Sequence, residues 1–224
     1  MTRKHMAVAT ALLVALMLGA GLIVGAALPE DAQLPVHWNL HGEADGFDDK
    51  WTALLAPAGL TALMGLLFYF LPALEPRRKG LERSQGLYLS GWAAVLLVCA
   101  VIEVAVVAAA LGRQAPMDRL MIGALGLMFI LIGNQLGKSR SMYMVGIRTP
   151  WTLASEEVWI KTHRLGGRLM VLAGFIYLAA ALAALPSSWR AALLIAAIAA
   201  IVVVPVVYSF LLWKREQESD QASG

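Results

Sequence analysis

Six long apolar stretches alternate with shorter polar segments along the chain, and this pattern predicts six membrane-spanning helices. The stretches cover residues 6–28, 52–74, 86–111, 117–136, 166–185 and 191–213. An α-helix needs about 20 apolar residues to cross roughly 30 Å of hydrocarbon, and each stretch provides them. We therefore expect an all-α integral membrane protein, with a short interfacial helix in the loop between the fourth and fifth stretches.

The composition also indicates a membrane protein. Hydrophobic residues make up 59% of the 224 residues and charged residues only 15%, whereas charged residues make up about a quarter of a typical soluble domain. The net charge of +3 is small and spread over the loops, which argues against direct nucleic-acid binding. The single cysteine, Cys99, lies within an apolar stretch and cannot form an intrachain disulfide.

The first apolar stretch also has one feature of a secretory signal peptide. Val24, Gly25 and Ala26 resemble a cleavage site. The apolar part is nevertheless longer than the roughly 7–15 residues typical of a signal peptide. We expect this stretch to be retained as the first membrane helix.

Basic residues are distributed unequally between the two sets of loops. Of the 18 lysines and arginines, all except Lys50, Arg113, Arg119 and Arg190 lie in the terminal segments, the second loop or the fourth loop. The positive-inside rule then places both termini and the fourth loop in the cytoplasm and the first loop outside. We expect a multi-pass protein of the cell membrane, with an N-terminal two-helix unit (1–75), a four-helix core (76–213) and a disordered tail (214–224).

The first polar loop, residues 29–50, is acidic and contains two histidines. His37 and His41 have the four-residue spacing that places two imidazoles on one face of a helix, where they would be able to share a metal ion. Two ligands alone do not define a zinc site, and histidines hydrogen-bonded within a loop are the alternative. We therefore predict no metal and no other cofactor.

The third apolar stretch contains an acidic residue, Glu103. An ionisable group inside a hydrocarbon-length segment is a candidate for function because its charge is costly there. The alternative is that Glu103 lies near the outer end of its helix, where water or Arg113 satisfies it. The pattern alone favours neither interpretation.

The fourth loop, within residues 134–168, carries the densest set of polar and aromatic groups. Gly146 and Pro150 predict a structured turn. Ser155, followed by Glu156 and Glu157, predicts a helix start, with a hydroxyl cap and acids at the positive end of the helix dipole.

The helix predicted after Ser155 would place Trp159 and His163 one turn apart on one face. Lys161, Arg164 and Arg168 would form a basic stripe along it. Such a helix suits the cytoplasmic headgroup layer, with the tryptophan in the interface and the cations facing lipid phosphates. We expect it to bend at residues 166–167 into the fifth stretch.

Two motifs in the chain resemble those of the SdpI family of bacterial immunity proteins. The first lies in the outer loop and is similar to a short domain of unknown function that often precedes the family core; it comprises Pro35, His37, Trp38, Asn39, Gly42, Asp45 and Lys50. The second comprises Gly133, Asn134, Gly146, Ile147, Arg148, Thr149, Pro150, Trp151, Thr152, Leu153, Trp159, Thr162, His163, Arg164 and Gly167. The chain departs from the family at Met142, where members usually carry asparagine.

The resemblance implies a non-enzymatic, multi-pass membrane protein that protects a cell from a secreted antimicrobial peptide toxin. Some members also transduce a signal by holding a transcriptional repressor at the membrane. The resulting candidate ligand or signalling residues, with Glu103 added from its position, are His37, Asn39, Asp45, Glu103, Asn134, Arg148, Thr149, Trp151, Trp159, His163 and Arg164.

Two other classes of function compete with immunity. An ion-coupled transporter or a lipid- or peptide-handling protein would use Glu103 in a polar pathway. A membrane enzyme would have few catalysts besides its four histidines, and the sequence lacks the HExxH, Ser-Lys and phosphate-loop patterns. Several candidates also have a purely structural alternative, since Arg148, Thr149 and Trp151 suit a turn and His163 suits a helix interface as well as a proton relay.

Overall fold

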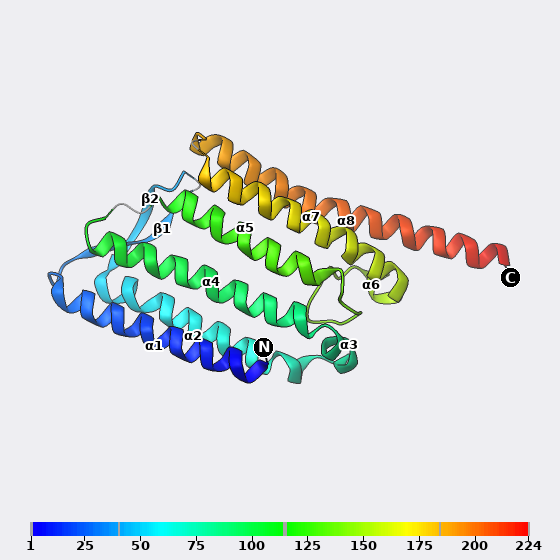
Figure 1. Cartoon of the computed structure of the whole chain (residues 1–224), viewed down its shortest axis with the longest axis horizontal. Coiled ribbons are helices and arrows are strands. Elements are labelled where there is room, and N and C mark those ends of the chain that lie inside the picture. Colours follow the sequence, from blue (N-terminus) through cyan, green and yellow to red (C-terminus); the bar gives the residue numbers. More distant parts are fainter. Residues whose placement is uncertain (1, 40, 114–115, 184, 224) are drawn as a thin grey trace.

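The computed structural model describes residues 2–39, 41–113, 116–183 and 185–223. Its elements follow the order α1 (Arg3–Ala27), β1 (Gln33–Trp38), β2 (Ala44–Asp49), α2 (Lys50–Leu74), α3 (Arg78–Arg83), α4 (Gln85–Ala110), α5 (Met117–Leu136), α6 (Pro150–Ala154), α7 (Glu156–Leu182) and α8 (Ser187–Ser223). Figure 1 shows the long helices side by side, with the strands at one end of the bundle and α3 and α6 at the other.

Six helices in the described ranges are long and apolar enough to cross a membrane, which confirms the predicted fold class. They are α1, α2, α4, α5, α7 and α8. Large apolar side chains on their outer faces stay more than half exposed, for example Leu16 at 71%, Ile23 at 75% and Phe175 at 60%. Contiguous apolar surface of this kind is suited to lipid contact, since soluble proteins rarely expose it.

Helices α1, α2 and α4 pack through a few buried polar and aromatic contacts. The indole Nε1 of Trp92 on α4 donates to Thr10 Oγ1 on α1 at 3.1 Å. The hydroxyl of Tyr88 donates to the carbonyl of Phe68 on α2 at 2.6 Å, and the rings of Phe68 and Trp92 stack with centroids 5.8 Å apart. Because α4 also packs on α5, it joins this group to the α5, α7 and α8 helices.

Helices α5 and α7 approach each other closely along a line of glycines. A Cβ atom on Gly167 would lie 2.6 Å from the carbonyl oxygen of Gly133, and one on Gly174 would lie 2.6 Å from that of Gly126. Small residues at facing positions let helix backbones approach in this way, and the gain is van der Waals contact in a medium that provides no hydrophobic driving force. The glycines therefore set the distance between these two helices.

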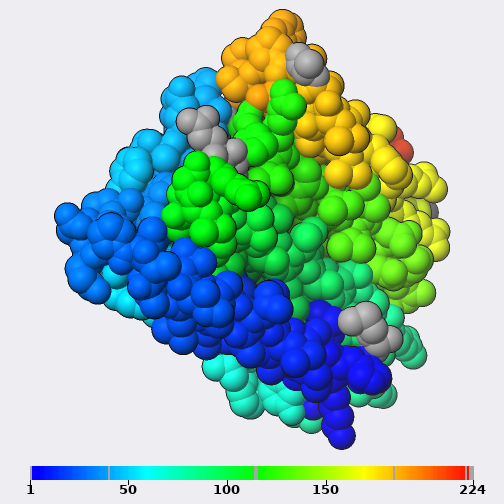
Figure 2. Space-filling view, turned by 60° about the vertical axis from the view of Figure 1, so that its left-hand side comes forward, coloured from blue at the N-terminus to red at the C-terminus, as the bar shows by residue number. Residues whose placement is uncertain are grey.

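The first loop forms an antiparallel hairpin that the all-helical expectation did not include. Pro35 pairs with Phe47 and Trp38 with Ala44, with irregularities in the register around His37. Figure 2 shows the light-blue hairpin on the same face as the green start of α5 and the orange start of α8. Because His37 lies in a strand, the spacing to His41 does not put the two rings on one helical face.

The hairpin leads directly into α2 through a carboxylate cap. Asp49 accepts from the backbone N–H groups of Trp51 at 2.9 Å and Thr52 at 3.1 Å and from the Thr52 hydroxyl. The hydrogen bonds from the side chain and backbone of Thr52 lower the pKa of Asp49 from its usual value. Beside the cap, the buried Lys50 ammonium donates to the carbonyl of Leu28 at 3.0 Å and pairs with Glu30 at 3.2 Å.

The helix predicted from Glu156, with Ser155 as its cap, is present, but the expectation that Trp159 lies in the lipid interface was wrong. The helix continues as α7 through the fifth apolar stretch to Leu182. Trp159 and His163 are buried in protein instead of facing lipid headgroups. The short helix that the fourth loop does contain is α6, which Pro150 begins.

The tail predicted to be disordered is helical instead, because α8 continues to Ser223. Lys214 and Glu218 lie one turn apart at 3.9 Å, and Glu216 accepts a hydrogen bond from Ser155 at 2.9 Å. A segment that extends an existing helix avoids the cost of nucleation, so polar residues with good helix propensity continue it. The C-terminal end of α8 extends beyond the other helices in Figure 1.

Candidate functional site

A buried carboxylate, Glu75, organises the loop end of the bundle. It lies just after α2 and is 1% exposed. It accepts from the backbone N–H groups of Arg77 at 2.8 Å, Tyr143 at 3.1 Å and Met144 at 2.7 Å. Glu75 therefore fixes the start of the fourth loop against the second loop through main-chain amides. The sequence analysis did not single it out, since it is one acid beside a run of basic residues.

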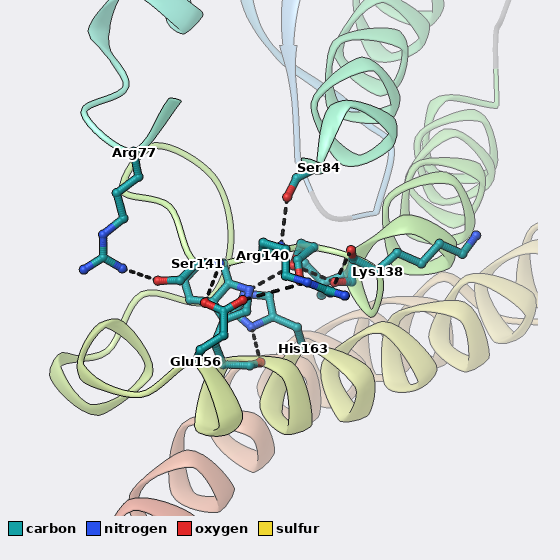
Figure 3. Close-up of polar contacts among 10 residues, drawn as sticks. Arg77, Ser84, Lys138, Arg140, Ser141, Glu156 and His163 are labelled. Carbon is teal, nitrogen blue, oxygen red and sulfur yellow. Dashed lines mark hydrogen bonds and ion pairs between the residues drawn. The ribbon is translucent and has the colours of Figure 1, made fainter. Parts of the chain in front are cut away.

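Arg77 adds side-chain contacts between the same two loops. Its guanidinium donates to the Ser141 hydroxyl, to the Tyr143 hydroxyl at 3.3 Å and to the carbonyl of Leu153 at 3.2 Å. It also lies 4.6 Å from the centroid of the Tyr143 ring, a distance suited to a cation–π contact. Figure 3 shows Arg77 reaching Ser141 from the separate second-loop segment.

A second set of contacts ties the fourth loop to α4 and α7. The backbone N–H of Arg140 donates to the Ser84 hydroxyl at 2.9 Å, and its guanidinium lies 3.9 Å from the Glu156 carboxylate. Glu156 also accepts from the backbone N–H of Ser141 at 3.3 Å. Figure 3 shows these groups converging where α7 begins. The loop is therefore a fixed structure with polar groups satisfied from several helices.

His163 holds the Gly146 turn. Its Nε2 accepts the backbone N–H of Ile147 at 2.8 Å, and its Nδ1 lies 2.8 Å from the carbonyl of Trp159. These partners assign the neutral tautomer with the proton on Nδ1, because Nε2 faces a donor. Gly146 has φ +123°, and a Cβ there would lie 2.6 Å from His163 Nε2. Only glycine fits, and the ring is fully used by structural hydrogen bonds.

Trp159 completes this buried arrangement. Its indole stacks on the His163 ring with centroids 3.9 Å apart, and its Nε1 donates to the Ser139 hydroxyl at 3.2 Å. Met142, the position at which the chain departs from the family pattern, is also fully buried in this core. Apolar packing therefore occupies the place where the resemblance implies an asparagine.

Thr149 and Trp151 connect the loop to α8. Thr149 caps α6 in a reciprocal arrangement with Thr152. The Trp151 indole N–H donates to the Ser209 hydroxyl, and its ring packs edge-on against Phe210 at 5.4 Å. These two motif residues thus have clear structural roles at an interface between distant segments.

Arg148 is an exposed residue of the motif, unlike the buried Thr149, Trp159 and His163. The structure gives its guanidinium one hydrogen bond, from Nη1 to the carbonyl of Tyr143 at 2.6 Å. Its remaining donors have no partner in the described part of the chain. Arg148 is therefore the residue of the turn that is best placed to contact another molecule.

Asn134 and Arg164 lie together, away from Arg148. Both are exposed and line a groove between α5 and α7. The structure thus divides the predicted inner residues into a buried set that holds the loop, an exposed Arg148, and a separate pair in this groove.

The outer motif builds the hairpin. Asn39 Oδ1 accepts from the backbone N–H groups of His41 at 2.9 Å and Glu43 at 3.1 Å, and Gly42 takes a positive φ of 81°. His37 Nδ1 pairs with Asp45 across the hairpin at 2.5 Å. Within the described ranges, no three His, Cys, Asp or Glu side chains gather as metal ligands.

A pocket of about 280 Å³ lies between this hairpin and the helices below it, and we call it the outer pocket after the side on which the positive-inside rule predicts it. His37, Trp38 and Asn39 line one side, and apolar residues of α5 and α8 line the other. Asp118 on α5, which also lines the pocket, pairs with the buried Arg190 of α8. The volume is below the range typical of drug-sized ligands, so it suits one or two side chains of a larger molecule.

Glu103 is 5% exposed, and neither carboxylate oxygen has a hydrogen-bond partner among the described residues. Within the described residues, Glu103 does not pair with Arg113, the partner that the alternative interpretation named. Trp92, Cys99 and Val106 lie on the same stripe of α4 at helical spacing, and this stripe faces α1 and α2. Packing alone gives no reason for a carboxyl group in a membrane helix that is buried without a partner among the described residues. Glu103 therefore stays a candidate for function.

These features define a multi-pass membrane protein with an ordered loop cluster at one end and a hairpin over a pocket at the other. Residues 138–209 match the SdpI/YfhL protein family, and residues 12–61 match a domain of unknown function, DUF1648. The chain is 24% identical over 149 residues to the Immunity protein SdpI of Bacillus subtilis (strain 168), covering 66% of this chain and 68% of that protein. The chain is therefore similar to the SdpI family in these regions, as its two motifs indicated. No solved structure matches it.

Proposed function

We propose that this protein is an immunity protein that protects the cell from a secreted antimicrobial peptide. The observation that carries the proposal is the similarity to the Immunity protein SdpI of Bacillus subtilis, which extends over two thirds of both chains. The outer pocket would receive an apolar side chain of the peptide, with His37, Asn39 and Asp45 holding the hairpin over it. The role is binding and not catalysis.

The inner end would carry the signal-transducing part of the function. Arg148 is exposed beside a loop that contacts α8 through Trp151 and α2 through Glu75. A cytoplasmic protein such as a transcriptional repressor would bind this end, with the Arg148 guanidinium offering free donors to a carboxylate. This assignment depends on the sidedness proposed from the positive-inside rule.

Replacing Arg148 should impair protection without impairing folding of the protein. In a Bacillus subtilis strain that lacks its own Immunity protein SdpI, expression of this chain should restore survival beside toxin-producing cells. Because we propose that binding at the inner end is needed for protection, Arg148→Ala should lower survival at least tenfold. Membrane levels should stay unchanged, because the structure gives this exposed side chain one hydrogen bond. Arg83→Ala, which removes another exposed cation, is the matched control. No protection by the unaltered chain, present in the membrane, would contradict the proposed immunity function.

The proposed sidedness predicts a definite topology. Green fluorescent protein fused after residue 224 should fluoresce, and alkaline phosphatase inserted at residue 45 should be active. Alkaline phosphatase inserted at residue 144 should be inactive. An active alkaline phosphatase at residue 144 would show that the orientation is opposite to the proposed one. Arg148 would then have no cytoplasmic role.

A second candidate function, an ion-coupled transporter, rests on Glu103 alone. A buried carboxyl without a partner in the described residues is the kind of group that binds a proton or cation during transport. In proteoliposomes, Glu103→Gln should then abolish a pH- or ion-dependent flux that the unaltered protein supports. Equal flux in the two proteins, or none in either, would leave Glu103 without a transport role.

A further inference from the structure

The α5–α7 groove, lined by Asn134, Lys138, Arg164 and Arg168 together with apolar residues of α7, has a volume of about 470 Å³. It exists because α5 and α7 carry glycines where they cross. A Cβ on Gly137 would lie 3.2 Å from the Cα of Arg164, and a Cβ on Gly133 would lie 2.7 Å from the carbonyl oxygen of Gly167. With no side chains to fill the crossing, the surface of the bundle is hollowed beside it.

Three exposed cations surround one end of this groove. Lys138, Arg164 and Arg168 form no salt bridge and no side-chain hydrogen bond to another described residue, unlike Arg140 and Lys161. Glu156 and Glu157 are the nearest acids in sequence, and they pair with those other two cations. The residues that line the groove include no acid, so its charge is uncompensated by the protein.

Interaction with the helix dipole accounts for only one of these cations. Lys138 follows the C-terminal end of α5, where a positive charge is favourable. Arg164 and Arg168 lie within α7, far from its C-terminal end. Their side chains are long enough to bring both guanidinium groups to the same small anion.

The other end of the groove is apolar and faces outward. Leu172 and Phe175 on α7 line it and are 59% and 60% exposed. They follow Arg164 and Arg168 at spacings of three and four residues, so all four lie on one face of the helix. The distance along the axis from Arg168 to Phe175 is roughly 10 Å at 1.5 Å per residue. Along α7, the cations come first and the exposed apolar side chains follow. A phospholipid has the same order, with a charged headgroup followed by apolar acyl chains.

We propose that the α5–α7 groove binds an anionic phospholipid. Arg164, Arg168 and Lys138 hold the phosphate and its neighbouring negative charge, and Asn134 offers an amide to the headgroup. The acyl chains lie along Leu172 and Phe175. Charge complementarity selects this occupant, because a zwitterionic lipid carries no net charge for three unpaired cations. The site is separate from the outer pocket and from Arg148, so it does not depend on the proposed immunity function.

The test measures retention of lipid by the purified full-length protein. Native mass spectrometry would compare bound phosphatidylglycerol with phosphatidylcholine of the same acyl chains. The double variant Arg164→Gln, Arg168→Gln should lower phosphatidylglycerol retention roughly tenfold, since each basic residue contributes to attraction of an anionic headgroup. The matched control, Lys79→Gln with Arg83→Gln, removes two charges from the same end of the bundle and should change retention less than twofold.

Several outcomes would overturn the proposal. These are equal retention of the two lipids, unchanged retention in the groove variant, or an equal loss in the control pair. Displacement of the lipid by millimolar glycerol 3-phosphate would also overturn it, since a free phosphate would then be the ligand. If the double variant does not fold, the comparison of phosphatidylglycerol with phosphatidylcholine on the unaltered protein still tests the proposal. Photoactivatable phosphatidylglycerol should label the peptide that contains residues 164–175, and even labelling of all helices would contradict the site.

Discussion

Replacing Glu75 by alanine is expected to destabilise the loop end of the bundle by on the order of 3 kcal/mol. The carboxylate is 1% exposed and accepts from the backbone N–H groups of Arg77, Tyr143 and Met144. Each buried donor that loses its acceptor lowers the free energy of unfolding by about 1–3 kcal/mol. Water that enters the vacated space restores part of this loss. Thermal unfolding of the purified protein in detergent would measure the change.

Two further variants make the result specific to the carboxylate. Glu75→Gln keeps one acceptor oxygen but turns an amide NH₂ toward backbone N–H groups, so its loss of stability should be intermediate. Glu82→Ala removes an exposed acid from the neighbouring helix α3 and should change stability by less than about 0.5 kcal/mol. If Glu75→Ala unfolds at the same temperature as the unaltered protein, the fourth loop does not depend on this anchor.

Replacing Gly167 by alanine is expected to separate α5 from α7 and to lower stability by about 1–3 kcal/mol. The added Cβ would lie 2.6 Å from the carbonyl oxygen of Gly133, a backbone atom that cannot turn aside as a side chain would. The helices must therefore move apart along their closest approach. Gly133→Ala should have a similar effect, since its Cβ would meet the carbonyl oxygen of Gly167 at 2.7 Å.

The control for this prediction is a glycine in open space. A Cβ on Gly59 of α2 would meet nothing within 4 Å. Gly59→Ala should leave stability unchanged or raise it by up to about 1 kcal/mol, because alanine is the better helix former. Thermal unfolding of the three variants in one detergent compares them directly. Equal stability of Gly167→Ala and Gly59→Ala would mean that the α5–α7 contact is looser than the structure indicates.

The candidate site was predictable as a set of residues but not as an arrangement. The turn at Gly146, the cap at Ser155 and the helix start at Glu156 follow from local chemistry, and the structure has all three. Local pattern suggested that Trp159 and His163 face the membrane interface, and this was wrong because Ser139 and Ile147 provide partners inside the protein. A basic segment after a tryptophan is common to interfacial helices and to buried ones, so periodicity does not separate them.

The residues that sequence analysis missed are those whose partners are distant in the chain. Glu75 binds amides nearly 70 positions away, and Ser209 on α8 receives the indole of Trp151. No spacing or local motif marks such pairs, because they form only when the helices pack. The hairpin was missed because its local signal is weak: β2 is a short polar strand without the alternating apolar pattern that predicts a sheet, and β1 contains a proline.

By itself, the sequence determined that this is a six-helix membrane protein with motifs similar to those of the SdpI family, because hydrocarbon thickness demands long apolar helices and the motifs are local in the chain. Only the tertiary structure decided which motif residues are exposed. It buried His163 and Trp159 and half-buried Trp151 as structural contacts, left Arg148 outside, and opened a groove where glycines let α5 and α7 approach. Burial depends on packing between segments far apart in sequence, and hydropathy along one segment does not specify its neighbours.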